Sequence, residues 1–159
     1  MVHLILLRHA KSDWTDEGLL DKDRPLNPRG KRAAPEMARW LEKQNLISDR
    51  ILCSSAQRTR ETLELMQAVW SAHPEVHFID RLYLASPQTI LEEAMGHSGG
   101  AKSLLLIGHN PGMEMLATQL SDEPCEMQTC TAVIFEASDG WPVDWWDSSS
   151  WNVAAKHRA

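Results

Sequence analysis

Residues 4–12 decide the fold of this chain, and they read Leu4-Ile5-Leu6-Leu7-Arg8-His9-Ala10-Lys11-Ser12. The run from residue 2 to residue 7 is almost entirely apolar and does not alternate with polar residues, which is typical of a strand buried on both faces of a parallel sheet. It stops abruptly at an arginine and a histidine. A buried strand that ends in this way places both side chains at an edge of the sheet, where they can meet a ligand.

The rest of the chain alternates between short apolar runs and segments with helical spacing. Strands are expected at residues 51–53, 76–79, 103–107 and 131–137. Helices are expected to begin at Asn27-Pro28, Ser54-Ser55 and Ser86-Pro87 and to occupy residues 113–120. Pro35 predicts a kink or a restart in the first helix. This order predicts an α/β three-layer sandwich with helices on both sides of a mostly parallel central sheet, in one domain over residues 1–159.

Composition excludes several classes of protein. The chain has 159 residues and a formal net charge of −6, which argues against nucleic acid as a partner. No apolar run reaches the roughly 18 residues of a membrane span, and no signal-peptide pattern is present, so we expect a cytoplasmic protein without membrane contact. The three cysteines lack a CxxC spacing, which argues against a disulfide framework and a zinc site.

Basic side chains follow three separate strands. Arg8-His9 ends the first strand, Arg58 lies in the first turn of the helix after the second, and His109 follows the strand at residues 103–107. If the sheet is parallel, all three strand ends meet at one edge. Arginine offers a planar fork of donors that suits phosphate oxygens, and a helix N-terminus adds a positive dipole end. The sequence therefore predicts a pocket for a tetrahedral anion, with Arg24 and Lys11 as further candidates at its rim.

Each of these residues also has an ordinary interpretation when taken alone. Arg8 could pair with a carboxylate, His9 could be a structural histidine, Arg58 could be solvated, and His109 could serve only in a turn. Lys11 fits a solvated surface residue better than a phosphate ligand. The occurrence of four such groups at one edge of the predicted sheet is what favours the anion pocket.

Four motifs in order carry a resemblance to a known family. They are Arg8-His9-Ala10-Lys11-Ser12, Asp23-Arg24-Pro25-Leu26-Asn27, Ser54-Ser55-Ala56-Gln57-Arg58-Thr59-Arg60-Glu61-Thr62 and Gly108-His109-Asn110-Pro111-Gly112. The chain resembles the histidine phosphatase superfamily, also called phosphoglycerate-mutase-like, and within it the SixA-type phosphohistidine phosphatases. Ala10 departs from the superfamily's glycine, but the SixA-like subgroup tolerates alanine at this position.

The resemblance implies that His9 attacks phosphorus and forms a phosphohistidine intermediate that water then hydrolyses. It implies that Arg8, Arg58 and His109 hold the phosphoryl oxygens and that no metal or other cofactor is needed. Arg24, in a loop made rigid by Pro25, is a further candidate for phosphate binding that ranks below these residues. Two positive neighbours should lower the pKa of His9 and keep it unprotonated.

The glutamate that often serves as the general acid in the family has no counterpart at the expected position of this sequence. The superfamily often has a glutamate soon after the third strand, and Arg81 stands there in this sequence. Asp80 and Asp13 are the candidates for a proton donor, and Asp23 is a further alternative. SixA-type enzymes also lack the usual glutamate, and a leaving imidazole needs less help from an acid than an alkoxide does.

Two other phosphatase chemistries fit less well. A cysteine phosphatase needs five residues between its thiolate and its arginine, but that spacing from Cys53 leads to Thr59. Asp21 and Asp23 are the only close pair of carboxylates that could begin a metal site, and they follow no strand, so we expect a solvated loop.

We therefore expect a metal-independent phosphatase whose substrate is phosphohistidine on a protein such as a histidine-phosphotransfer domain. The alternatives are a phosphatase of small phosphate esters or anhydrides, and a binding module that recognises a phosphorylated partner without turnover. The oligomeric state cannot be read from the sequence.

Overall fold

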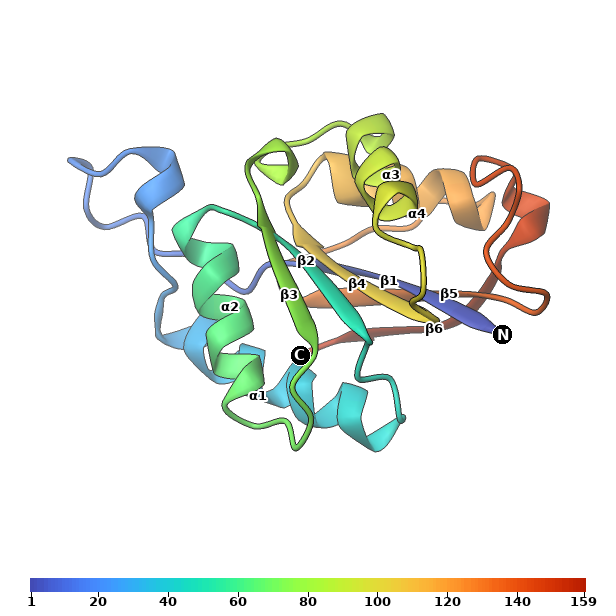
Figure 1. Ribbon diagram of the computed structural model, residues 1–159. Coiled ribbons are helices and arrows are strands. Elements are labelled where there is room, and N and C mark those ends of the chain that lie inside the picture. Colours follow the sequence, from blue (N-terminus) through green and yellow to red (C-terminus); the bar gives the residue numbers. More distant parts are fainter.

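The computed structural model describes all of residues 1–159 and contains one sheet with helices on both of its faces (Figure 1). The strands are β1 (Val2–Arg8), β2 (Arg50–Ser54), β3 (Glu75–Ile79), β4 (Ser103–Gly108), β5 (Thr131–Ala137) and β6 (Asn152–Arg158). The α-helices are α1 (Pro28–Lys43), α2 (Gln57–Gln67), α3 (Pro87–Gly96) and α4 (Gly112–Ser121). Three short 3₁₀ helices are η1 (Asp21–Asp23), η2 (Asp80–Leu82) and η3 (Ser148–Ser150).

The six strands lie in the order β3-β2-β4-β1-β5-β6. The four strands from β3 to β1 are parallel, while β5 and β6 run antiparallel to their neighbours. The prediction of a mostly parallel sheet is confirmed, and the complete sheet is mixed. The edge strand β6 was not predicted, because its side chains are mostly exposed and carry no alternating apolar pattern.

Two hydrophobic cores cover the two faces of the sheet, and β1 belongs to both. Leu4 and Leu6 pack into the core beneath α3 and α4, whereas Ile5 and Leu7 pack into the core beneath α1 and α2. Figure 1 shows these two helix pairs on opposite sides of the sheet. This burial on both faces explains why the run from residue 4 to residue 7 does not alternate, and it confirms the predicted three layers.

The predicted helix starts agree with the structure in two of three cases. The side chains of Asn27 and Ser86 accept hydrogen bonds from the backbone N–H groups of Gly30 and Thr89. The predicted serine cap of α2 is wrong, since the N-cap residue is Ala56, which has no side chain that could accept a capping hydrogen bond. The predicted restart at Pro35 is also wrong, because α1 continues through that residue as one helix.

No helix of the chain combines the length and the apolar composition that a membrane crossing requires.

Candidate active site

The carboxyl ends of the parallel strands bring the predicted basic residues together. Arg8 is the last residue of β1 and pairs in register with Gly108, so His9 and His109 leave two adjacent strands at the same level. Arg58 lies in the first turn of α2, directly after β2. These groups share one cavity of about 350 Å³, whose lining residues are Arg8, His9, Lys11, Ser12, Trp14, Asp21, Arg24, Arg58, Leu84, His109, Asn110 and Thr129.

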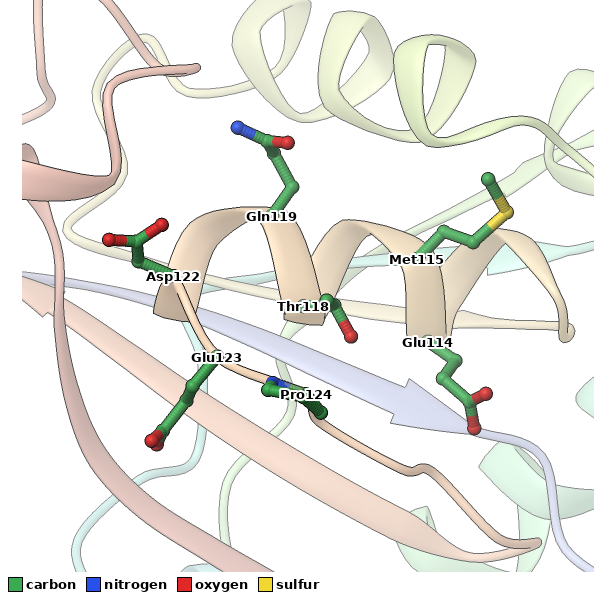
Figure 2. A pocket seen from close by; sticks show the side chains of 7 residues that line it. All are labelled: Glu114, Met115, Thr118, Gln119, Asp122, Glu123 and Pro124. Atoms are coloured by element: carbon green, nitrogen blue, oxygen red, sulfur yellow. The ribbon is translucent and has the colours of Figure 1, made fainter.

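A larger cavity of about 490 Å³ lies elsewhere, on the outer face of α4 and the turn after it. Figure 2 shows its seven lining side chains, which include Glu114, Asp122 and Glu123 and no lysine, arginine or histidine. A surface of this charge would repel a phosphate group. The cavity at the strand ends is therefore the candidate active site.

The ring of His9 is held in one orientation and one tautomer. His9 is only 6% exposed, and its Nδ1 lies 2.6 Å from the backbone oxygen of Ala10. A carbonyl oxygen can only accept, so Nδ1 must carry the proton and Nε2 must carry a free lone pair. The backbone N–H of Ala10 in turn donates to Oγ1 of Thr62 on α2, which fixes the peptide that holds the ring.

The pKa of His9 falls to about 3, first because burial disfavours the charged ring and then because Arg58 and Arg8 are positive neighbours. The positive neighbours that the sequence predicts thus contribute to the low pKa, but burial is its largest cause. A low pKa leaves His9 neutral at physiological pH, which is the state that a nucleophilic imidazole needs.

Arg58 and Arg8 approach this nitrogen in different ways. Arg58 is buried, and its Nε–H donates to Nε2 of His9 over 3.3 Å. Arg8 donates through its NH1 group to the backbone oxygen of Met127, while its Nε is buried without a hydrogen-bond partner. Buried donors without partners are rare, and the Nε of Arg8 is available to an anion in the cavity.

His109 completes the set of groups around His9. The two rings lie 5.2 Å apart between centroids, and Nε2 of His109 is 2.7 Å from Oγ of Ser54. Its Nδ1 is buried without a partner, and its pKa also falls to about 3, mainly through burial. Ser54, which the sequence analysis assigned to a helix cap, thus contacts a candidate phosphate ligand instead.

The two rim candidates both line the cavity. Arg24 is buried, bonds to Oγ of Ser12 over 2.7 Å, and lies 3.5 Å from the ring centre of Trp14. Lys11 lines the cavity with its side chain partly exposed.

The candidates for a proton donor, Asp80, Asp13 and the alternative Asp23, all lie outside the cavity lining. Asp13 accepts hydrogen bonds from Thr15, and Asp80 lies beside Ser55 and Lys22 with its side chain 85% exposed. Arg81, which stands at the family's glutamate position, pairs with Glu92 and Glu93 of α3. The assignment of a general acid stays a prediction.

Asp21 is the carboxylate that lines the cavity, and the sequence analysis placed it in a solvated loop. Its side chain is indeed 43% exposed, but it also accepts hydrogen bonds from Arg24, Arg58 and Tyr83, which the sequence did not predict. These donors, the Tyr83 hydroxyl first, lower the pKa of Asp21 to about 2 and keep it ionised. The one local signal for these contacts in the sequence was that Arg24 follows Asp21 by three positions, which brings the two side chains together within a helical turn.

Cys53 lies apart from this arrangement. It is fully buried, and burial raises the pKa of its thiol to about 12, so it cannot supply the thiolate of a cysteine phosphatase at physiological pH.

Comparisons with known proteins identify the family of the chain. The family model described as the histidine phosphatase superfamily (branch 1) matches residues 4–83. An uncharacterized chloroplastic protein of Arabidopsis thaliana is 37% identical over an alignment of 145 residues, which covers 84% of this chain and 66% of that protein. The chain thus spans slightly less than two thirds of that relative.

Two solved structures share the fold. SixA from Agrobacterium tumefaciens is 26% identical, with a TM-score of 0.85 over 99% of this chain and 98% of its own. The protein histidine phosphatase SixA in complex with tungstate is 20% identical, with a TM-score of 0.82 over 99% of this chain and 97% of its own. The expected fold class is therefore confirmed.

Proposed function

The chain belongs to the histidine phosphatase superfamily and is of its SixA type, and from this premise we propose that it removes the phosphoryl group from phosphohistidine on a protein. The proposal rests above all on one observation. The lone pair of His9 Nε2 faces a cavity in which Arg8, Arg58 and His109 present the donors that a phosphoryl group requires. The SixA structures named above are described as phosphohistidine or protein histidine phosphatases, which supports the same substrate class.

In the first step, the Nε2 lone pair of His9 forms a bond to phosphorus. The P–N bond of the substrate breaks, and its electron pair leaves with the substrate imidazole, which departs already protonated on its second nitrogen. Arg8, Arg58 and His109 stabilise the charge on the three phosphoryl oxygens. In the second step, the oxygen of a water molecule attacks phosphorus, the bond to Nε2 breaks, and inorganic phosphate leaves.

The charge state of the cavity favours a nitrogen leaving group. An alkoxide leaves slowly unless an acid protonates it, and a general acid must be protonated at the working pH. Asp21 is the carboxylate among the lining residues, and its pKa of about 2 means that it holds no proton to give. A phosphohistidine needs no such donor, which supports it over alkyl phosphate esters as the substrate.

The test is a rapid-quench reaction of wild type and His9→Ala with a ³²P-labelled, histidine-phosphorylated phosphotransfer domain. We expect acid-labile label on wild type, and neither label nor phosphate release with His9→Ala. His73→Ala is the matched control, because His73 is exposed and lies outside the cavity.

The same preparations should be compared on phosphoserine and on an aryl phosphate. We expect turnover of the aryl ester, whose leaving group is stable, and at least about 100-fold slower turnover of phosphoserine. Fast turnover of phosphoserine would favour the small-ester alternative, and binding of phosphate without turnover of any substrate would favour the binding module.

A further inference from the structure

We infer that Asp21 is a positioning residue that aims the Nε–H of Arg58 at the phosphoryl group on His9. The inference rests on the proposed function, since it assigns a role within that reaction. It arises from a set of contacts that converge on one carboxylate beside the nucleophile.

Residue 21 holds both terminal nitrogens of the Arg58 guanidinium. NH1 donates to the backbone oxygen of Asp21 over 2.7 Å, and NH2 donates to Oδ2 over 3.1 Å. The third donor, Nε–H, is left to face Nε2 of His9. A guanidinium is planar and rigid, so fixing two of its nitrogens also fixes the direction of the third.

Asp21 is itself held from two other sides. Its Oδ1 accepts from Nε and NH2 of Arg24 over 3.0 and 2.9 Å, and its Oδ2 accepts from the hydroxyl of Tyr83 over 2.5 Å. Arg24 is buried, and Tyr83 stands edge-on to the ring of His109 at 5.5 Å. The carboxylate therefore joins groups on both sides of the cavity into one frame.

This frame has a consequence for catalysis. Donors that are oriented before the substrate arrives need no reorganisation when charge develops on the phosphoryl oxygens. When phosphorus bonds to Nε2 of His9, a phosphoryl oxygen comes to lie beside that nitrogen and can accept from the Nε–H of Arg58 while both terminal nitrogens stay on Asp21. Loss of the Asp21 carboxylate would leave the charge of Arg58 in place and weaken the hold on its NH2 group, so that the guanidinium is fixed mainly through NH1 and its direction is less defined.

The test is a double-mutant cycle on the rate of His9 phosphorylation, measured in a single turnover with the labelled phosphotransfer domain. Asp21→Asn keeps the shape of the side chain and removes its charge. We expect it to slow phosphorylation about 10- to 100-fold, as is usual for a group that orients a ligand-binding residue. In an Arg58→Ala background the same substitution should change the rate less than about twofold, because its target is gone.

Two further variants control for damage to the fold. Glu17→Gln changes an exposed carboxylate of the preceding loop that lies outside the cavity lining, and it should leave the rate unchanged. Tyr83→Phe removes one donor to Asp21 and should slow phosphorylation by a smaller factor, again only while Arg58 is present. Thermal unfolding of each variant verifies that it is folded.

The outcomes separate the two proposals. If wild type acquires no label on His9, the proposed function is wrong. If wild type is labelled and Arg58→Ala is slow, but Asp21→Asn reacts as fast as wild type or faster, Asp21 does not position Arg58. The inference would also be overturned if the double variant were slowed by the product of the factors by which Asp21→Asn and Arg58→Ala each slow phosphorylation.

Discussion

Nε of Arg58 donates a hydrogen bond to Nε2 of His9 over 3.3 Å, so a cation already points at the nitrogen proposed to attack phosphorus. The contact occupies the lone pair of Nε2 until the phosphoryl group displaces it, and the charge of Arg58 helps to keep the ring neutral. It also means that the phosphoryl group must enter between these two side chains.

Removal of Arg58 should lower turnover more than binding. We expect Arg58→Ala to lower kcat on the phosphorylated protein by roughly 10²- to 10³-fold, as for loss of one oxyanion donor. Arg58→Lys should recover only part of this loss, because lysine lacks the rigid fork. Arg60→Ala is the control, since Arg60 points outward to Ser55 and Phe78. Equal kcat values for Arg58→Ala and wild type would contradict the assignment.

In the physiological pH range, kcat/KM should show no fall that is caused by protonation of His9. A pKa of about 3 leaves His9 neutral from pH 8 down to pH 5. The pH dependence of kcat/KM reports the pKa values of the essential groups in the free enzyme. We expect a nearly flat profile over this range after correction for spontaneous hydrolysis. A loss of wild-type activity centred near pH 6.5 would mean that the pKa of His9 is not lowered in the folded protein.

The stability of the fold should fall in acid for the same reason. The folded-state pKa values of His9 and His109 are about 3, below their ordinary value of 6.5, so between these pH values only the unfolded chain takes up the protons. Stability is retained above pH 6.5 and declines as the pH falls toward 3, by up to about 2 kcal/mol per histidine at pH 5. Urea unfolding at pH 7 and at pH 5 measures this change in the free energy of unfolding. Between these two pH values, His9→Asn should lose less stability than wild type.

Ser54 should matter through His109. Ser54→Ala removes the hydroxyl beside Nε2 of His109 and leaves both ring nitrogens of a buried histidine without a partner. We expect a loss of about 1 to 3 kcal/mol in stability and a measurable fall in kcat. Ser55→Ala is the neighbouring control, because the Ser55 hydroxyl donates to the exposed Asp80 outside the cavity lining. Wild-type kcat for Ser54→Ala would show that this contact does not position His109.

Gly30 should be required for the path of the loop after His9. A Cβ at Gly30 would lie 2.2 Å from the backbone oxygen of Lys11, so the loop or α1 would have to shift. We expect Gly30→Ala to destabilise the protein by about 1 to 3 kcal/mol and to lower activity. A Cβ at Gly99 would have no atom within 4 Å, so Gly99→Ala should change neither stability nor activity in the same assays.

The parts of the site that follow from local pattern could be predicted from the sequence. The unbroken apolar run of β1 implied burial on both faces, and residues at the ends of parallel strands had to share an edge. That reasoning places Arg8, His9, Arg58 and His109 in one cavity, and the structure places them there.

The parts that depend on distant contacts could not be predicted in this way. Asp21 meets Arg58 and Tyr83, which are 37 and 62 positions away in the sequence, and it does so from a short 3₁₀ turn with no hydrophobic periodicity. β6 was missed for a related reason, since an exposed edge strand leaves no apolar signature. Ser54 had the composition of a helix cap, but its hydroxyl lies beside a histidine on another strand end.

The most direct test of the account is the site of phosphorylation in the trapped intermediate. Wild type quenched during turnover of the ³²P-labelled phosphotransfer domain should carry one acid-labile, alkali-stable phosphoryl group, and peptide mapping should place it on His9. His9→Ala should carry none and release no phosphate, while His73→Ala behaves as wild type. Label on another residue, or phosphate release by His9→Ala at the wild-type rate, would contradict the central claim.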